Sequence, residues 1–134
     1  MKIMLLCSKA FYGMLLDYQE KLEKLGHEIV MPNCWDCPET EAKFRGTKDH
    51  ATFKANMYRQ SEEKIKNVDA VLVLNFEKKG IKNYIGGATF LEIYDAFRMD
   101  KKIFFINDIP DIMLKDELIG FSPIIINDDL NKIV

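Results

Sequence analysis

Short apolar runs alternate with amphipathic stretches along the chain. The run at residues 3–7 is continuously apolar, and the run at residues 69–75 is rich in valine and leucine. Such runs are typical of parallel strands that are covered by helices on both faces. The pattern predicts five strands, at residues 3–7, 28–31, 69–75, 102–107 and 123–127.

The stretches between these runs have helical spacing. In residues 12–25, the side chains of Leu15, Tyr18 and Leu22 share one helix face, and Gly26 follows as the expected C-cap. Residues 33–48 have no clean period and are predicted to form a long loop. Further helices are predicted at residues 49–67, 86–99 and 111–120, with a last helical turn at the end of the chain.

Strands that alternate with helices predict right-handed crossovers and an α/β fold. We expect one domain over residues 1–134, a three-layer sandwich whose five parallel strands have the flavodoxin-like order 2-1-3-4-5. Ligands of such sheets bind beyond the carboxyl ends of the strands, near the switch point. That rule brings together residues 7–12, 75–87 and 107–108.

Composition and charge narrow the function. The chain has 134 residues, of which 48% are hydrophobic and 30% charged, a globular composition. Its net charge of −2 and its pI near 5.7 argue against duplex nucleic acid as the main partner. No apolar run approaches the roughly 18 residues of a membrane span. Because the N-terminal apolar run does not have the pattern of a secretory signal, we expect a cytoplasmic protein with reduced cysteines.

The sequence lacks the residues that several known activities of this fold class require. The chain has no acidic pair after the first strand, and neither a GxxxxGK[ST] nor a GxGxxG phosphate loop. Cys34 and Cys37 form a C-x-x-C in the predicted loop, which offers a redox or metal site as an alternative to ordinary loop packing. His27 and His50 are the only histidines, so we expect no metal site and no cofactor.

The segment Asn83–Glu92 carries the most chemical information. Gly86 and Gly87 precede a predicted helix, whose N-terminal N–H groups favour an anion at the mouth of the sheet. Glu92 lies one turn inside this helix, where we expect an ionised carboxylate that could attack or stabilise an anomeric carbon. The spacing of Thr89 and Glu92 equally fits a capping box, in which Glu92 only caps the helix.

Three segments in this order resemble the nucleoside 2-deoxyribosyltransferase superfamily, which includes nucleoside deoxyribosyltransferases and nucleotide N-glycosidases. They are the strand Asp69–Asn75, the glycine-rich turn and helix at Gly86–Phe97, and the strand that begins at Lys101. The segment Asn83–Glu92 and the C-terminal stretch are similar to a bacterial and archaeal branch of this group. The resemblance implies a nucleoside or nucleotide substrate and a homodimer or larger homo-oligomer.

The resemblance also implies roles for individual residues. Glu92 matches the catalytic glutamate of the family, which attacks C1′ or stabilises the oxocarbenium-like centre. The remaining substrate-binding candidates follow from the same match. They are Ser8 and Tyr12 for the sugar or phosphate, Asn75, Gly86 and Gly87 for the pocket lining, and Phe11 or Tyr84 for stacking on a base.

The sequence departs from the family pattern at two positions. Gly86 stands where the transferases have an acidic residue, and Tyr94 replaces a small residue and is expected to narrow the pocket. The leading hypothesis is therefore cleavage of an N-glycosidic bond, or base transfer, with Glu92 as nucleophile. The alternative is a non-catalytic nucleotide-binding or sensor domain of the same fold.

Overall fold

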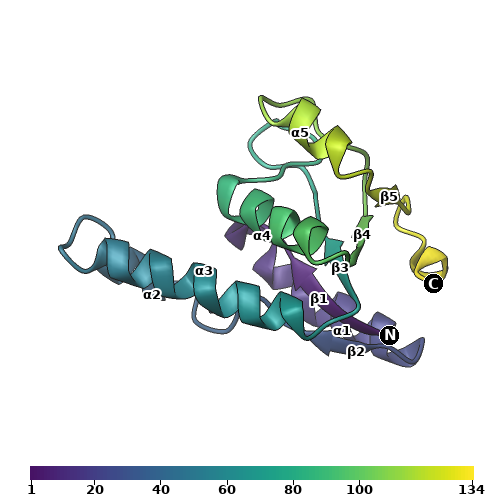
Figure 1. The fold of residues 1–134 in the computed structure, drawn as a ribbon, viewed down its shortest axis with the longest axis horizontal. Coiled ribbons are helices and arrows are strands. Elements are labelled where there is room, and N and C mark those ends of the chain that lie inside the picture. Colours follow the sequence, from purple (N-terminus) through teal and green to yellow (C-terminus); the bar gives the residue numbers. More distant parts are fainter.

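The computed structural model describes residues 1–134 and contains one parallel sheet of five strands (Figure 1). The strands are β1 (Lys2–Leu6), β2 (Glu28–Val30), β3 (Ala70–Val73), β4 (Lys102–Phe105) and β5 (Ile124–Ile125). Their order across the sheet is β2-β1-β3-β4-β5, and every pairing is parallel. The predicted fold class and strand order are confirmed.

Five α-helices connect and cover the strands. They are α1 (Leu15–Lys24), α2 (Thr40–Phe44), α3 (His50–Lys66), α4 (Gly87–Arg98) and α5 (Lys115–Gly120), with 3-10 turns at Lys9–Met14 and Leu130–Lys132. The first predicted helix thus begins as a 3-10 turn. Gly26, at φ +91°, follows α1 as expected of a C-terminal glycine.

The prediction of a loop over residues 33–48 was wrong for its second half, because α2 lies there. This five-residue helix is too short to show a helical period. Contacts with α3 hold it instead: the Phe44 and Phe53 rings stack with their centroids 4.9 Å apart, and Lys54 forms an ion pair with Glu41 at 2.9 Å. Both contacts depend on the tertiary fold.

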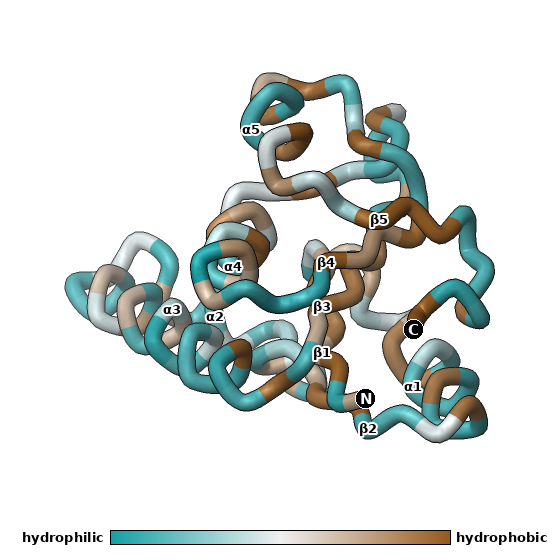
Figure 2. The backbone as a smooth tube through the Cα atoms, turned by 45° about the vertical axis from the view of Figure 1, so that its right-hand side comes forward, coloured by the Kyte–Doolittle hydropathy of each residue, from teal (hydrophilic) through white to brown (hydrophobic).

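Alternate residues of the buried strands supply two separate cores. Ile3, Leu5 and Leu72 pack on the face that α1 covers. Met4 and Val71 pack on the opposite face, beneath α3, α4 and α5. Figure 2 shows the apolar strands lying between α1 on one side and α3 and α4 on the other. This is the predicted three-layer arrangement. No helix has the length and apolar character needed to cross a membrane.

Candidate active site

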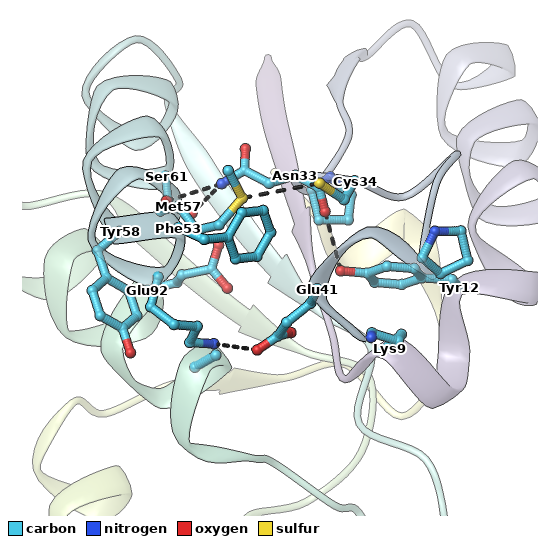
Figure 3. A pocket seen from close by; sticks show the side chains of 14 residues that line it. Lys9, Tyr12, Asn33, Cys34, Glu41, Phe53, Met57, Tyr58, Ser61 and Glu92 are labelled. Atoms are coloured by element: carbon cyan, nitrogen blue, oxygen red, sulfur yellow. Dashed lines mark hydrogen bonds and ion pairs between the residues drawn. The ribbon is translucent and has the colours of Figure 1, made fainter. Parts of the chain in front are cut away.

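A cavity lies at the carboxyl end of the sheet, between α3, α4 and the loops that follow β1 and β2 (Figure 3). Glu92 of α4 faces it, together with Tyr12 from the turn after β1. Loop residues after β2 and side chains from α2 and α3 complete the wall. The cavity thus lies at the edge of the sheet that the topological rule names, on the α3 and α4 face, and it extends towards β2.

Glu92 does not cap its helix. The N-cap of α4 is Gly86, and the amide of Phe90 donates to the Gly86 carbonyl at 2.9 Å. Thr89 is therefore the third residue of the helix, and its buried side chain is not at a capping position. The capping-box interpretation is wrong, which leaves the Glu92 carboxyl group free to face the cavity.

Burial changes the charge state expected for Glu92. The residue keeps some exposure, but its carboxyl group lies deep between α3 and α4. Burial raises the pKa of Glu92 to about 7, against the opposing effects of the Ser61 hydroxyl and the Lys64 ammonium group. A carboxyl group with such a pKa is partly protonated at neutral pH, whereas the sequence analysis predicted an ionised carboxylate.

Two polar residues that the sequence analysis did not single out, Asn33 and Ser61, contact each other in the cavity wall. The Asn33 amide donates to Ser61 Oγ at 2.9 Å and to the Met57 carbonyl at 3.0 Å. Ser61 interrupts an apolar stripe that runs from Met57 to Ile65 at four-residue spacing. A buried serine in such a stripe is the sequence signal that could have pointed to this site.

Charged and aromatic groups frame the rest of the cavity. Lys54 and Glu41 form their 2.9 Å ion pair in its wall, and the rings of Tyr12, Phe53 and Tyr58 also line it. Burial acts to raise the pKa of Glu41, but the hydrogen bond and charge of Lys54 prevail and the pKa is lowered. The cavity thus combines apolar ring faces with one ion pair and one carboxyl group, that of Glu92, whose pKa is raised.

The predicted pocket residue Asn75 lies outside this cavity and has structural partners. Its side-chain amide donates to the carbonyls of Asn107 and Asp108 at 2.9 and 3.0 Å, and its Oδ1 accepts from the Asn107 amide at 2.9 Å. Asn75 is fully buried. It ties the end of β3 to the segment after β4 and has no amide hydrogen left for a ligand.

Ser8 and Tyr84 meet at the same edge of the sheet but do not line the cavity. Lys78 joins them: its Nζ donates to Ser8 Oγ at 3.4 Å and lies 4.7 Å from the centre of the Tyr84 ring. Phe11, the other residue expected to stack on a base, is buried in the core against Phe76, with ring centroids 5.6 Å apart. Of the aromatic candidates, only Tyr12 faces the cavity.

The two glycines before α4 have ordinary backbone conformations, because neither has a positive φ. The reason for glycine at Gly86 is space: a Cβ there would lie 3.2 Å from the Tyr84 hydroxyl oxygen. Gly87 has open space around it and begins α4. The sequence predicted a tight turn at these glycines; the structure instead shows a close approach between Gly86 and the Tyr84 side chain.

The surroundings of Cys34 do not activate its thiol. Cys34 and Cys37 are both free, and Cys34 lines the cavity with its Sγ 3.9 Å from the sulfur of Met57. Burial, and then the hydrogen bond with Cys37, raise the pKa of Cys34. A redox-active thiol needs the opposite shift, so the geometry favours loop packing over the redox alternative.

Tyr94 does not narrow the cavity, contrary to the expectation from the sequence. Its side chain is exposed on the outer side of α4, in a neighbouring groove that shares Tyr58, Ser61 and Glu92 with the cavity. Its ring packs at 6.1 Å from that of Phe121. The helical spacing explains this placement, since residues two apart on a helix point in different directions.

No family model and no curated protein matches this sequence. Among solved structures, the fold is similar to that of a 2-deoxyribosyltransferase from the psychrotolerant bacterium Bacillus psychrosaccharolyticus. The TM-score is 0.54 at 21% sequence identity, over 78% of this chain and 71% of that chain. The likeness establishes a shared fold.

Proposed function

We propose that this protein cleaves the N-glycosidic bond of a nucleoside or nucleotide, or transfers its base, with Glu92 as the nucleophile. The observation that carries the proposal is the position of Glu92. Its carboxyl group lies in a cavity at the carboxyl end of the sheet, without a capping partner. The fold shared with a 2-deoxyribosyltransferase supports the same class of substrate.

The proposed reaction has two balanced steps. A carboxylate oxygen of Glu92 bonds to C1′ while the bond from C1′ to the base nitrogen breaks, and the departing base keeps the electron pair and takes a proton from solvent. Water, or a second base, then attacks C1′ and releases a proton to solvent, while the bond from C1′ to Glu92 breaks and the carboxylate departs. Water as acceptor gives hydrolysis, and a base as acceptor gives transfer.

The rings of the cavity supply a surface for the base. Tyr12, Phe53 and Tyr58 come from two sides of the cavity, the turn after β1 and helix α3. Planar bases stack on such rings with little dependence on base identity. Lys9 lies in the same wall and suits an anionic group on the sugar, whereas Lys54 is paired with Glu41. These contacts favour a nucleoside or nucleotide over a free sugar.

We also propose a homodimer or larger homo-oligomer in the cytoplasm. Large apolar side chains on the outer face of α4 support the assembly, since Leu91, Tyr94 and Phe97 are each more than two-fifths exposed. Light scattering on the purified protein tests it. A monomer at tens of micromolar concentration would contradict the proposed assembly without affecting the site.

Mass spectrometry of base release tests the proposed function. The purified protein is incubated with a mixture of ribo- and deoxyribonucleosides and their monophosphates, beside Glu92→Ala and the control Glu63→Gln, an exposed carboxylate of α3. We expect release by the wild type and the control, and a loss of about a thousandfold or more in Glu92→Ala. Release that survives in Glu92→Ala would remove Glu92 as nucleophile.

The sensor alternative predicts another outcome of the same experiment. Gly86, in place of the acidic residue of the transferases, is the observation that favours it. A protein that binds a nucleotide in equilibrium dialysis but releases no base from any substrate would favour the sensor. In that case Glu92→Gln leaves nucleotide binding nearly intact.

A further inference from the structure

Ser61 occupies an unusual position for a polar residue. It lies on α3 within an apolar stripe, and only 6% of its surface is exposed. Its hydroxyl oxygen accepts a hydrogen bond from the Asn33 amide at 2.9 Å. A buried hydroxyl also carries a proton, and that proton needs an acceptor, because a buried unpaired donor costs about 1–3 kcal/mol.

The usual acceptor for a helical serine is the carbonyl four residues earlier. For Ser61 that carbonyl belongs to Met57, and it is already occupied. It accepts the amide of Ser61 in the α-helix and the side-chain amide of Asn33 at 3.0 Å. A carbonyl oxygen has two lone pairs, so no place remains there for the Ser61 hydroxyl.

Asn33 Oδ1 is a buried acceptor without a partner, but the Asn33 side chain presents its Nδ2 to Ser61, and a further acceptor lies across the cavity wall. Ser61 and Glu92 line the cavity together, and both also line the groove on the outer side of α3 and α4. Figure 3 shows the Asn33 amide reaching Ser61, with the Glu92 carboxyl group beneath the same turn of helix. The Glu92 carboxyl group is therefore the acceptor in this wall to which we assign the hydroxyl proton of Ser61.

We propose that Asn33 and Ser61 are positioning residues for Glu92, in a chain of hydrogen bonds that runs from the Asn33 amide to the Ser61 hydroxyl and on to the Glu92 carboxylate. The inference rests on the proposed function, because it assigns these residues to the orientation of its nucleophile. Asn33 acts indirectly. Its side-chain amide occupies the Met57 carbonyl oxygen, so the Ser61 hydroxyl cannot donate to that carbonyl of its own helix.

The charged surroundings of Glu92 agree with this role. Lys64 and Lys54 on α3 favour its ionised form, and Asp95 on α4 opposes it. The neutral Cys7 thiol and Tyr12 hydroxyl lie on the β1 side, and burial raises the pKa of each. Among the groups that act on the pKa of Glu92, the hydrogen bond from Ser61 is the largest effect that lowers it.

Carbon-13 NMR of the Glu92 carboxyl group tests the chain without using activity. Titrations are recorded for the wild type, Ser61→Ala, Ser61→Thr and Asn33→Ala, with Asn67→Ala at the exposed end of α3 as the matched control. We expect the Glu92 pKa to rise by about one unit in Ser61→Ala and in Asn33→Ala. Ser61→Thr, which keeps the hydroxyl, and Asn67→Ala should titrate like the wild type.

The double variant Asn33→Ala with Ser61→Ala sharpens the test. If both residues act through one chain, its pKa shift equals that of either single variant. In base release, Ser61→Ala should lower kcat about tenfold and leave KM nearly unchanged. Unchanged titration of Glu92 in Ser61→Ala would overturn the positioning role. Base release absent from every protein, with the expected shifts present, would contradict the proposed function and leave the hydrogen-bond chain standing.

Discussion

Two groups of polar residues lie at the carboxyl end of the sheet, and they differ in what their polar atoms contact. The first is the group formed by Asn75, Asn107 and Asp108, where side-chain and backbone groups satisfy one another. The second surrounds Glu92, whose carboxyl group faces a cavity and titrates near neutral pH. Both match the rule that ligands bind at this edge, yet only the second is open to a ligand.

The difference distinguishes polar residues whose atoms all have partners from polar residues that are open to a ligand. Asn75 is fully buried, and its amide hydrogens both have partners, so its replacement disturbs folding. Glu92 is held in an environment that disfavours its charge, so it costs stability when ionised. The two residues should therefore respond to substitution in opposite ways.

The larger effect is expected for Glu92→Gln as the pH changes. The folded protein holds the Glu92 proton with a pKa of about 7, above the ordinary value of 4.5. Since the folded state binds more protons in this interval, the free energy of unfolding of the wild type falls as the pH rises from about 4.5 to 7. The stability of Glu92→Gln relative to the wild type should therefore increase by about 3 kcal/mol between pH 4 and pH 8.

Urea denaturation at both pH values measures this difference, and Glu63→Gln, at an exposed carboxylate, serves as the control. A constant difference between Glu92→Gln and the wild type across the pH range would contradict the buried, uncapped position of Glu92. In the same variant we expect base release to be lost, so that activity falls while stability at pH 8 rises.

A smaller and opposite effect is expected for Asn75→Ala. The variant leaves the carbonyls of Asn107 and Asp108 and the amide of Asn107 without the partners they have in the wild type. We expect a loss of about 2 kcal/mol in the free energy of unfolding, with KM for the nucleoside or nucleotide within about twofold of the wild type. Denaturation curves and steady-state kinetics of the folded protein measure the two quantities.

A KM that rises tenfold or more in Asn75→Ala, at little cost in stability, would reverse the comparison. Asn75 would then be a ligand-binding residue, as the resemblance of the sequence had implied. The two regions would form one site that extends across the switch point between β1 and β3.

The fold could be predicted from the sequence because its signals are local. Strands β1, β3 and β4 are covered on both faces, so nearly all of their residues are apolar and the sequence shows them as continuous apolar runs. Helix α2 shows no such pattern in the sequence, because it is held by tertiary contacts with α3. Strand β5, with two paired residues, is shorter than its apolar run, since pairing with β4 ends at Ile125.

The candidate site was only partly predictable. The position of Glu92 followed from the spacing of the glycine-rich turn, the helix and the topological rule. Whether Glu92 caps the helix or faces the cavity depends on where α4 begins. The sequence does not decide this, because the spacing between Thr89 and Glu92 is the same in either case. The serine at Ser61, within an apolar stripe, was a signal in the sequence, but its contact with Asn33 could not be predicted, because a loop and a helix far apart in the chain meet only in the fold.

Trapping of a covalent intermediate tests the central claim most directly. The protein is incubated with a 2-fluoro-substituted nucleoside, whose fluorine slows the breakdown of a glycosyl ester, and is then digested with trypsin. The account predicts the added mass of the sugar on the peptide Asn83–Arg98, with fragment ions that place it on Glu92 rather than on Asp95. Base release from this substrate without an adduct, or an adduct on any other residue, would contradict the assignment of Glu92 as the nucleophile.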